Sequence, residues 1–134
     1  MKLTSRYRFS ASHRLDTPAL SPEENRKLYG KCNYPHGHGH DYVLDITVEG
    51  PVDDNGQVVN REAMDELVRE RVLARLDHKN LNADIPEMAG SVATTENLAT
   101  LVHRALAGGW TLPARLARVR ISETARNTFE LEVA

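Results

Sequence analysis

The sequence predicts an α+β domain in which a four-stranded antiparallel sheet carries two helices on one face. Two segments near the start and two near the end alternate polar and apolar side chains or are rich in β-branched residues, as strands are. Two central segments repeat apolar side chains at helical spacing. The predicted elements, in the order β-β-α-α-β-β, are strands at 2–13 and 38–49, helices at 60–76 and 94–109, and strands at 117–123 and 127–133.

The first two predicted strands each carry histidine on one face. Alternation places Phe9 and His13 on the same face of the first strand. In the second strand, a period of two sends His38, His40 and Tyr42 to one face. If the two strands pair in antiparallel order, the histidine that ends the first lies close to the two that begin the second.

Polar connections separate the predicted elements. Residues 14–31 contain two prolines and a glycine without a sustained period, so we expect a long loop that lies as a flap beside Cys32. Residues 50–57 have the composition of a turn. Residues 77–93 are expected to be irregular.

Both helices have start signals in the sequence. Asn60 is predicted to cap the first helix. The second opens at Thr94 or Thr95 and ends at the glycines of residues 108–109. The apolar positions that make the first helix amphipathic are Met64, Leu67, Val68, Val72 and Leu76.

The last two strands are predicted to complete the sheet. Val119, Ile121 and Glu123 share one face of the third strand, so an acid ends an apolar stripe. The fourth strand turns Phe129, Leu131 and Val133 inward. The opposite face of the sheet is expected to carry aliphatic side chains, which a chain this short would cover by oligomerisation.

Composition limits the class of protein. The length of 134 residues fits one domain, residues 1–134. A net charge of -2 with 27% charged residues indicates neither a nucleic-acid surface nor a membrane surface. No apolar run is long enough for a transmembrane helix and no signal peptide precedes the first strand. A single cysteine excludes an internal disulfide, so a cytoplasmic protein is expected.

His13, His38 and His40 are candidate metal ligands. Three histidines with an open fourth position are typical of catalytic Zn²⁺. A lone His-x-His pair is more often a histidine-rich loop, but a third histidine on a strand and the nearby Cys32 favour a metal site. Imidazole also binds nickel, iron and copper, so the sequence leaves the metal open.

Cys32 and the pair Asp77–His78 could take part in catalysis, but the sequence spacing does not decide their roles. Cys32 is a candidate base or nucleophile beside a metal, but a buried inert thiol and a fourth zinc ligand are alternatives. Asp77 can orient the His78 imidazole for proton transfer. The alternative is that His78 only complements the dipole at a helix C-terminus.

Glu123 can accept two hydrogen bonds, from a ring N–H and an exocyclic amine, as a guanine-like or pterin heterocycle offers them. The alternative is an acid that reaches solvent at the end of a strand. Thr94, Thr95 and Glu96 are explained as a helix N-terminus, and a ligand contact would be additional.

Six segments, which span nearly the whole chain, form a pattern that is specific in combination. They are Phe9–Leu15, Cys32–Tyr42, Gly56–Asn60, Leu76–Asn82, Thr94–Asn97 and Glu123–Asn127. Together these segments resemble the 6-pyruvoyl-tetrahydropterin synthase family, which includes the 6-carboxytetrahydropterin synthases of queuosine biosynthesis.

The resemblance implies a tunnelling fold, in which three sheets close into a barrel and two trimers form a homo-hexamer with sites at subunit interfaces. It implies Zn²⁺ on His13, His38 and His40, and proton abstraction by Cys32. The remaining residues that the resemblance assigns are Asp77 and His78 as a proton relay, Glu123 as the pterin anchor, and Thr94, Thr95 and Glu96 as the lining of the pterin pocket.

The implied activity is a lyase reaction that converts 7,8-dihydroneopterin triphosphate to 6-pyruvoyl-tetrahydropterin with elimination of triphosphate. The run from Cys32 to Tyr42 is closer to this branch, although His36 stands where a smaller polar residue is expected. The alternatives are 6-carboxy-5,6,7,8-tetrahydropterin synthesis and a zinc- or pterin-binding protein without turnover. A zinc hydrolase is a third reading, which the pterin-like pattern disfavours.

Overall fold

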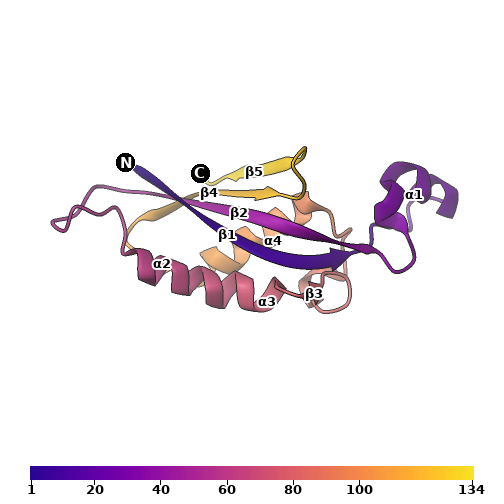
Figure 1. The fold of residues 1–134 in the computed structure, drawn as a ribbon, viewed down its shortest axis with the longest axis horizontal. Helices are drawn as coiled ribbons and strands as arrows, with labels where there is room; N and C mark the ends of the chain where they lie inside the picture. Colours follow the sequence, from indigo (N-terminus) through magenta and orange to yellow (C-terminus); the bar gives the residue numbers. More distant parts are fainter.

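The computed structural model describes all 134 residues and has two layers, a sheet and a set of helices along one of its faces (Figure 1). The predicted α+β class is confirmed. The strands lie across the sheet in the order β3-β1-β2-β4-β5. Their bounds are β1 Lys2–His13, β2 His38–Glu49, β3 Lys79–Asn80, β4 Arg115–Ser122 and β5 Thr128–Glu132.

The prediction of four strands that are all antiparallel is wrong in one detail. β3 is a fifth strand, and it pairs in parallel with Ala11 and Ser12 of β1. A strand of two residues is too short to produce an alternating pattern in the sequence. It forms because the backbone N–H groups of His78 and Leu81 donate to the carbonyls of Ser10 and Ser12.

β1 and β2 form the long antiparallel ladder at the centre of the sheet. His13 lies opposite His38 in the register, as the sequence predicts. The inner face of β2 is fully packed: Tyr42 is 1% exposed, and Leu44, Ile46 and Val48 are 0% exposed. This apolar core holds the histidine-bearing ends of both strands in a fixed register.

The outer face of the sheet is polar, so the expectation of aliphatic side chains there is wrong. Arg6 forms a bidentate pair with the buried Asp45, at 2.9 and 3.1 Å. Thr4 and Thr47 share a hydrogen bond of 2.7 Å between their hydroxyls. These cross-strand pairs satisfy four of the outward side chains within the chain.

The helices α2 Arg61–Val68, α3 Ala74–Leu76 and α4 Thr95–Ala107 cover the inner face. A π-helical turn, Arg69–Leu73, joins α2 to α3. Four buried residues of this segment lie four positions apart in the sequence. In a regular helix, each would be rotated by about 40° about the helix axis from the one before it. They are Met64, Val68, Val72 and Leu76. The wider π turn counteracts this rotation. No helix is both long and apolar enough to span a membrane.

The predicted caps are present. The Asn60 side chain accepts from the N–H of Ala63, and Thr94 accepts from the N–H of Asn97. β4 ends at Ser122, one residue earlier than predicted, so Glu123 lies in the turn before β5. Phe129 and Leu131 of β5 pair with Ile121 and Val119, on the predicted inner side.

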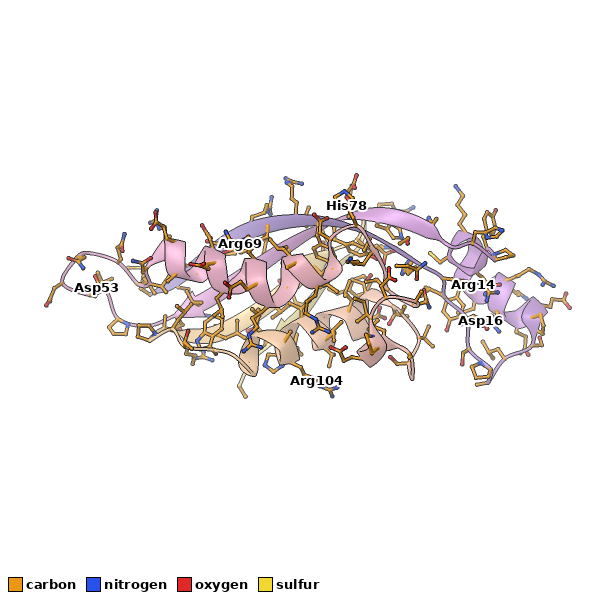
Figure 2. All side chains as sticks on the ribbon, turned by 90° about the horizontal axis from the view of Figure 1, so that it is seen from below. Arg14, Asp16, Asp53, Arg69, His78 and Arg104 are labelled. Carbon is orange, nitrogen blue, oxygen red and sulfur yellow. The ribbon has the colours of Figure 1, made fainter.

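The connection from 14 to 31 is only partly a loop, contrary to the prediction. It contains α1 Pro22–Tyr29, followed by a 3-10 helix at Gly30–Asn33. Ser21 and Glu24 form a capping box with Pro22 at the first position, which is a local start signal that the missing long-range period obscured. α1 projects beyond the end of β1, and Figure 2 shows Arg14 and Asp16 at its base.

Candidate active site

Four side chains converge where β1 ends and β2 begins. Each of His13, Cys32, His38 and His40 offers one ligand atom, and these atoms all lie within 4.8 Å of one another. The Nε2 atoms of His13 and His40 are 3.2 Å apart. Two imidazole nitrogens on one tetrahedral zinc ion would be about 3.3 Å apart, given Zn–N bonds of about 2.0–2.1 Å. The cluster therefore has the donors and the spacing of a metal centre.

The surroundings of His13 prepare it as a ligand. The ring is 1% exposed, and its Nδ1–H donates to the Ala93 carbonyl at 2.9 Å. Because this bond places the proton on Nδ1, Nε2 presents its lone pair to the cluster. Burial also lowers the pKa of His13 and of His40, which favours the neutral form of both rings.

Cys32 lies against this cluster. Its Sγ atom is 2.9 Å from Nε2 of His38. Burial raises the pKa of the Cys32 thiol, and the negative charge of Glu123 adds to this rise. A cation at the cluster would act in the opposite direction, because it favours the thiolate.

Glu123 and Thr95 border the cluster on the β4 side. Glu123 Oε1 lies 3.4 Å from Nε2 of His40, and the other carboxylate oxygen accepts a hydrogen bond from the Thr95 hydroxyl. Thr95 is 1% exposed, so a residue that the sequence explained as a helix start also supports this carboxylate. Thr94 instead caps α4, and Glu96 is exposed on its first turn.

Asp77 and His78 lie at the junction of α3 and β3. The Asp77 carboxylate accepts a hydrogen bond from the Ser10 N–H at 2.9 Å, which is the main cause of its lowered pKa, and it lies 3.1 Å from His78 Nδ1. His78 is 83% exposed and borders an open hollow of about 480 Å³ that His40 also lines. No hydrogen bond or ion pair joins either residue to the histidine–cysteine cluster of its own chain.

The sequence analysis gave no functional role to two residues of this region. Asn33 is 4% exposed, and its amide donates to the Leu15 carbonyl at 2.6 Å and to the Asp16 carboxylate at 3.0 Å. The buried Tyr42 hydroxyl has no hydrogen-bond partner within the chain. Adjacency to Cys32 was the only sequence signal for Asn33, and the second-strand pattern explained Tyr42 as core. His36 is exposed, and its ring is not among the clustered ligand groups.

Sequence comparisons place the chain in a known family. The sequence model of a family described as 6-pyruvoyl tetrahydropterin synthase matches residues 2–133. The chain is 44% identical over 128 residues to the 6-pyruvoyl tetrahydrobiopterin synthase of Homo sapiens, covering 94% of this chain and 87% of that protein. It is 46% identical over 121 residues to the enzyme of that name from Poecilia reticulata, covering 89% and 81%.

A solved structure has the same fold. The 6-pyruvoyl tetrahydropterin synthase of Caenorhabditis elegans superimposes with a TM-score of 0.93 at 34% identity. The superposition covers 100% of this chain and 96% of the other.

Proposed function

Because the chain belongs to the 6-pyruvoyl tetrahydropterin synthase family, a family of lyases, we propose that it converts 7,8-dihydroneopterin triphosphate to 6-pyruvoyl-tetrahydropterin and releases triphosphate. The observation that supports this most is the convergence of three imidazoles, a thiol and a carboxylate at one end of the sheet. These are the groups that a metal-assisted proton transfer on a bound heterocycle requires.

In this proposal His13, His38 and His40 hold Zn²⁺. The donor set fits, since neutral imidazoles at this spacing suit a tetrahedral ion. When bound, the ion would supply Lewis acidity that acidifies the protons of the hydroxylated side chain of the substrate. The bond from His13 to Ala93 fixes the ligand tautomer before the metal arrives.

Glu123 is proposed to hold the pterin ring through its N–H and amine groups. The bond from Thr95 restricts the carboxylate, so that it presents its free acceptor sites in one orientation. The short separation from His40 would place the ring beside the metal ligands. Thr94 and Glu96 lie at most at the edge of such a pocket, because the Thr94 hydroxyl caps α4 and the Glu96 side chain is exposed.

Cys32 is proposed as the base that removes a proton from the substrate side chain, and His78 as the group that exchanges protons on the other side. The contact with Asp77 orients the His78 ring. Both steps move protons only, so the internal rearrangement needs no redox cofactor.

A homo-hexamer of two trimers is the proposed assembly. Two observations support association through the sheet: β5 is an unpaired edge, and at the other edge β3 covers only Ala11 and Ser12 of β1. Asp77 and His78, which no hydrogen bond or ion pair joins to the cluster of their own chain, would then act at the cluster of a neighbouring chain. Light scattering should give the mass of six 15.0 kDa chains. A monomeric mass would contradict the assembly.

The direct test is anaerobic incubation of the zinc-loaded protein with 7,8-dihydroneopterin triphosphate, followed by mass spectrometry of the products. The expected product is 6-pyruvoyl-tetrahydropterin together with inorganic triphosphate. Formation of 6-carboxy-tetrahydropterin with acetaldehyde would replace the proposal by the queuosine branch. No turnover by protein with full metal content would overturn both.

A further inference from the structure

The Cys32 thiol lies within the cluster of candidate metal ligands. An imidazole nitrogen and a thiolate sulfur on one tetrahedral zinc ion would be about 3.5 Å apart, given bonds of about 2.0–2.1 Å and 2.3 Å. Sγ of Cys32 lies 2.9 Å from Nε2 of His38 and within 4.8 Å of the ligand atoms of the other two histidines. The thiol is therefore inside the donor set and completes four donors.

Backbone and side-chain hydrogen bonds hold the Cys32 segment beside the end of β1. The Cys32 carbonyl accepts from the Leu15 N–H at 2.6 Å, two residues after the ligand His13. The buried Asn33 amide binds the Leu15 carbonyl and the Asp16 carboxylate, and the Asn33 carbonyl accepts from Arg14 Nε at 3.2 Å. These bonds join the segment around Cys32 to the end of β1. The cysteine backbone is thus fixed against the histidines, and only rotation about its Cα–Cβ bond can move the sulfur.

Three imidazoles and one thiolate are a complete tetrahedral ligand set for zinc. A four-coordinate site closed in this way has no open position for a substrate oxygen, and a thiolate bound to the metal is a much weaker base than a free one. Cys32 can therefore combine both roles only if it leaves the metal when the pterin binds. The deprotonated sulfur would then be released as a thiolate, without a further proton acceptor.

We infer that Cys32 is the fourth metal ligand in the pterin-free enzyme, and that pterin binding releases it as the catalytic thiolate. The release of Cys32 on pterin binding rests on the proposed function. One residue thereby has two alternating roles: a ligand that closes the metal site, and the base that works beside it. The exchange breaks one metal–sulfur bond and changes no oxidation state.

Cobalt substitution tests this directly, because a thiolate bound to Co²⁺ gives a charge-transfer band in the near ultraviolet and imidazole does not. Cys32 is the only cysteine of the chain, so no other residue can produce such a band. The Co²⁺-loaded protein without pterin is expected to show the band. The Cys32→Ser variant is expected to lose it while retaining one Co²⁺ per chain on the three histidines.

The second measurement adds 7,8-dihydroneopterin, which lacks the triphosphate leaving group and so cannot complete the elimination. Pterin fluorescence reports its binding independently of the metal spectrum. The band of the wild-type protein should disappear in step with pterin binding. An Asn33→Asp variant, which loses the amide donor, should show a weaker band because its sulfur is less well positioned.

Each result has a definite meaning. Absence of the band in cobalt-loaded wild-type protein would overturn the inference, even if the protein turns over its substrate. A band that persists at saturating pterin would overturn the release step and make Cys32 a permanent ligand. Lack of turnover with a band that appears and disappears as expected would overturn the proposed reaction and leave the ligand exchange standing.

Discussion

The Glu123 carboxylate lies 3.4 Å from Nε2 of His40, so a group suited to bind a heterocycle is in contact with a proposed metal ligand. The hydroxyl of Thr95 restricts this carboxylate from the N-terminal turn of α4. β2, the start of α4 and the turn after β4 are distant in the sequence, and they meet at this carboxylate. A substrate ring bound there would have its side chain beside the metal.

Replacing Glu123 by Gln should weaken substrate binding with little change in metal content. The amide keeps the shape of the side chain but loses the charge, and hydrogen bonds to charged groups contribute about 1.5–3 kcal/mol. The KM is expected to rise roughly 10- to 100-fold. Steady-state kinetics and metal analysis check this. The matched control, Glu66→Gln on the exposed face of α2, should leave the KM unchanged. An unchanged KM for Glu123→Gln would remove the residue from the pterin site.

Removal of the metal should lower the thermal stability of the protein. A ligand that binds only the folded chain stabilises it by about 2.7 kcal/mol at a concentration of 100 times its Kd. The melting temperature is therefore expected to fall by several degrees after chelation and to recover on addition of Zn²⁺. A His13→Gln/His40→Gln double variant should show no such recovery. Equal melting temperatures with and without chelator would argue against a metal in the cluster.

The metal-free protein should lose stability as the pH falls below about 6.5, the ordinary pKa of histidine. Burial lowers the pKa of His13 and His40 in the folded chain, so the unfolded chain takes up protons first. Protonation of the unfolded state then favours unfolding until the lower, folded pKa values are reached. Urea unfolding of chelated protein between pH 8 and 5 measures this. The His13→Gln variant should show a flatter profile, and an identical slope would contradict the assignment.

Gly37→Ala should destabilise the protein and reduce metal binding. Gly37 has φ +66°, and an added Cβ would lie 2.2 Å from the carbonyl oxygen of His13. The left-handed conformation alone costs about 1–2 kcal/mol, and the clash forces β1 and the start of β2 apart. Urea unfolding and metal analysis should show a loss greater than about 2 kcal/mol and a lower metal content.

The control for this variant is Gly56→Ala. Gly56 also has a positive φ, +78°, but no atom lies within 4 Å of an added Cβ. Only the conformational cost applies, and metal content should stay at the wild-type level. Similar losses in both variants would mean that the contact with His13 has no role.

Asp77→Asn should lower kcat while the fold remains stable. The amide oxygen can still accept the hydrogen bond from the Ser10 N–H, so the free energy of unfolding should change by less than about 1 kcal/mol. Without the carboxylate, the charged form of His78 loses its partner, and a fall in kcat of roughly 100-fold or more is expected. The control Asp65→Asn, at an exposed carboxylate that binds Tyr7, should keep the wild-type kcat. A wild-type kcat for Asp77→Asn would exclude the proposed relay.

Sequence reasoning predicted the central features of the site because they depend on local periodicity. Alternation along β1 and β2 alone placed His13, His38 and His40 on the inner face, and antiparallel pairing brought them together. The caps of α2 and α4 followed from Asn60 and Thr94, since a cap is an interaction between residues three apart. Such features are encoded within a few residues.

The tertiary structure alone decided the rest. It brings Sγ of Cys32 to 2.9 Å from His38, because Asn33 and Leu15 form hydrogen bonds between segments that no period relates. It also adds β3, whose two residues pair with β1 through backbone bonds that carry no sequence pattern. The sequence by itself determined which side chains share a face, because side-chain direction follows from local backbone geometry. Which loop lies over that face depended on long-range hydrogen bonds, and these form only when the whole chain is folded.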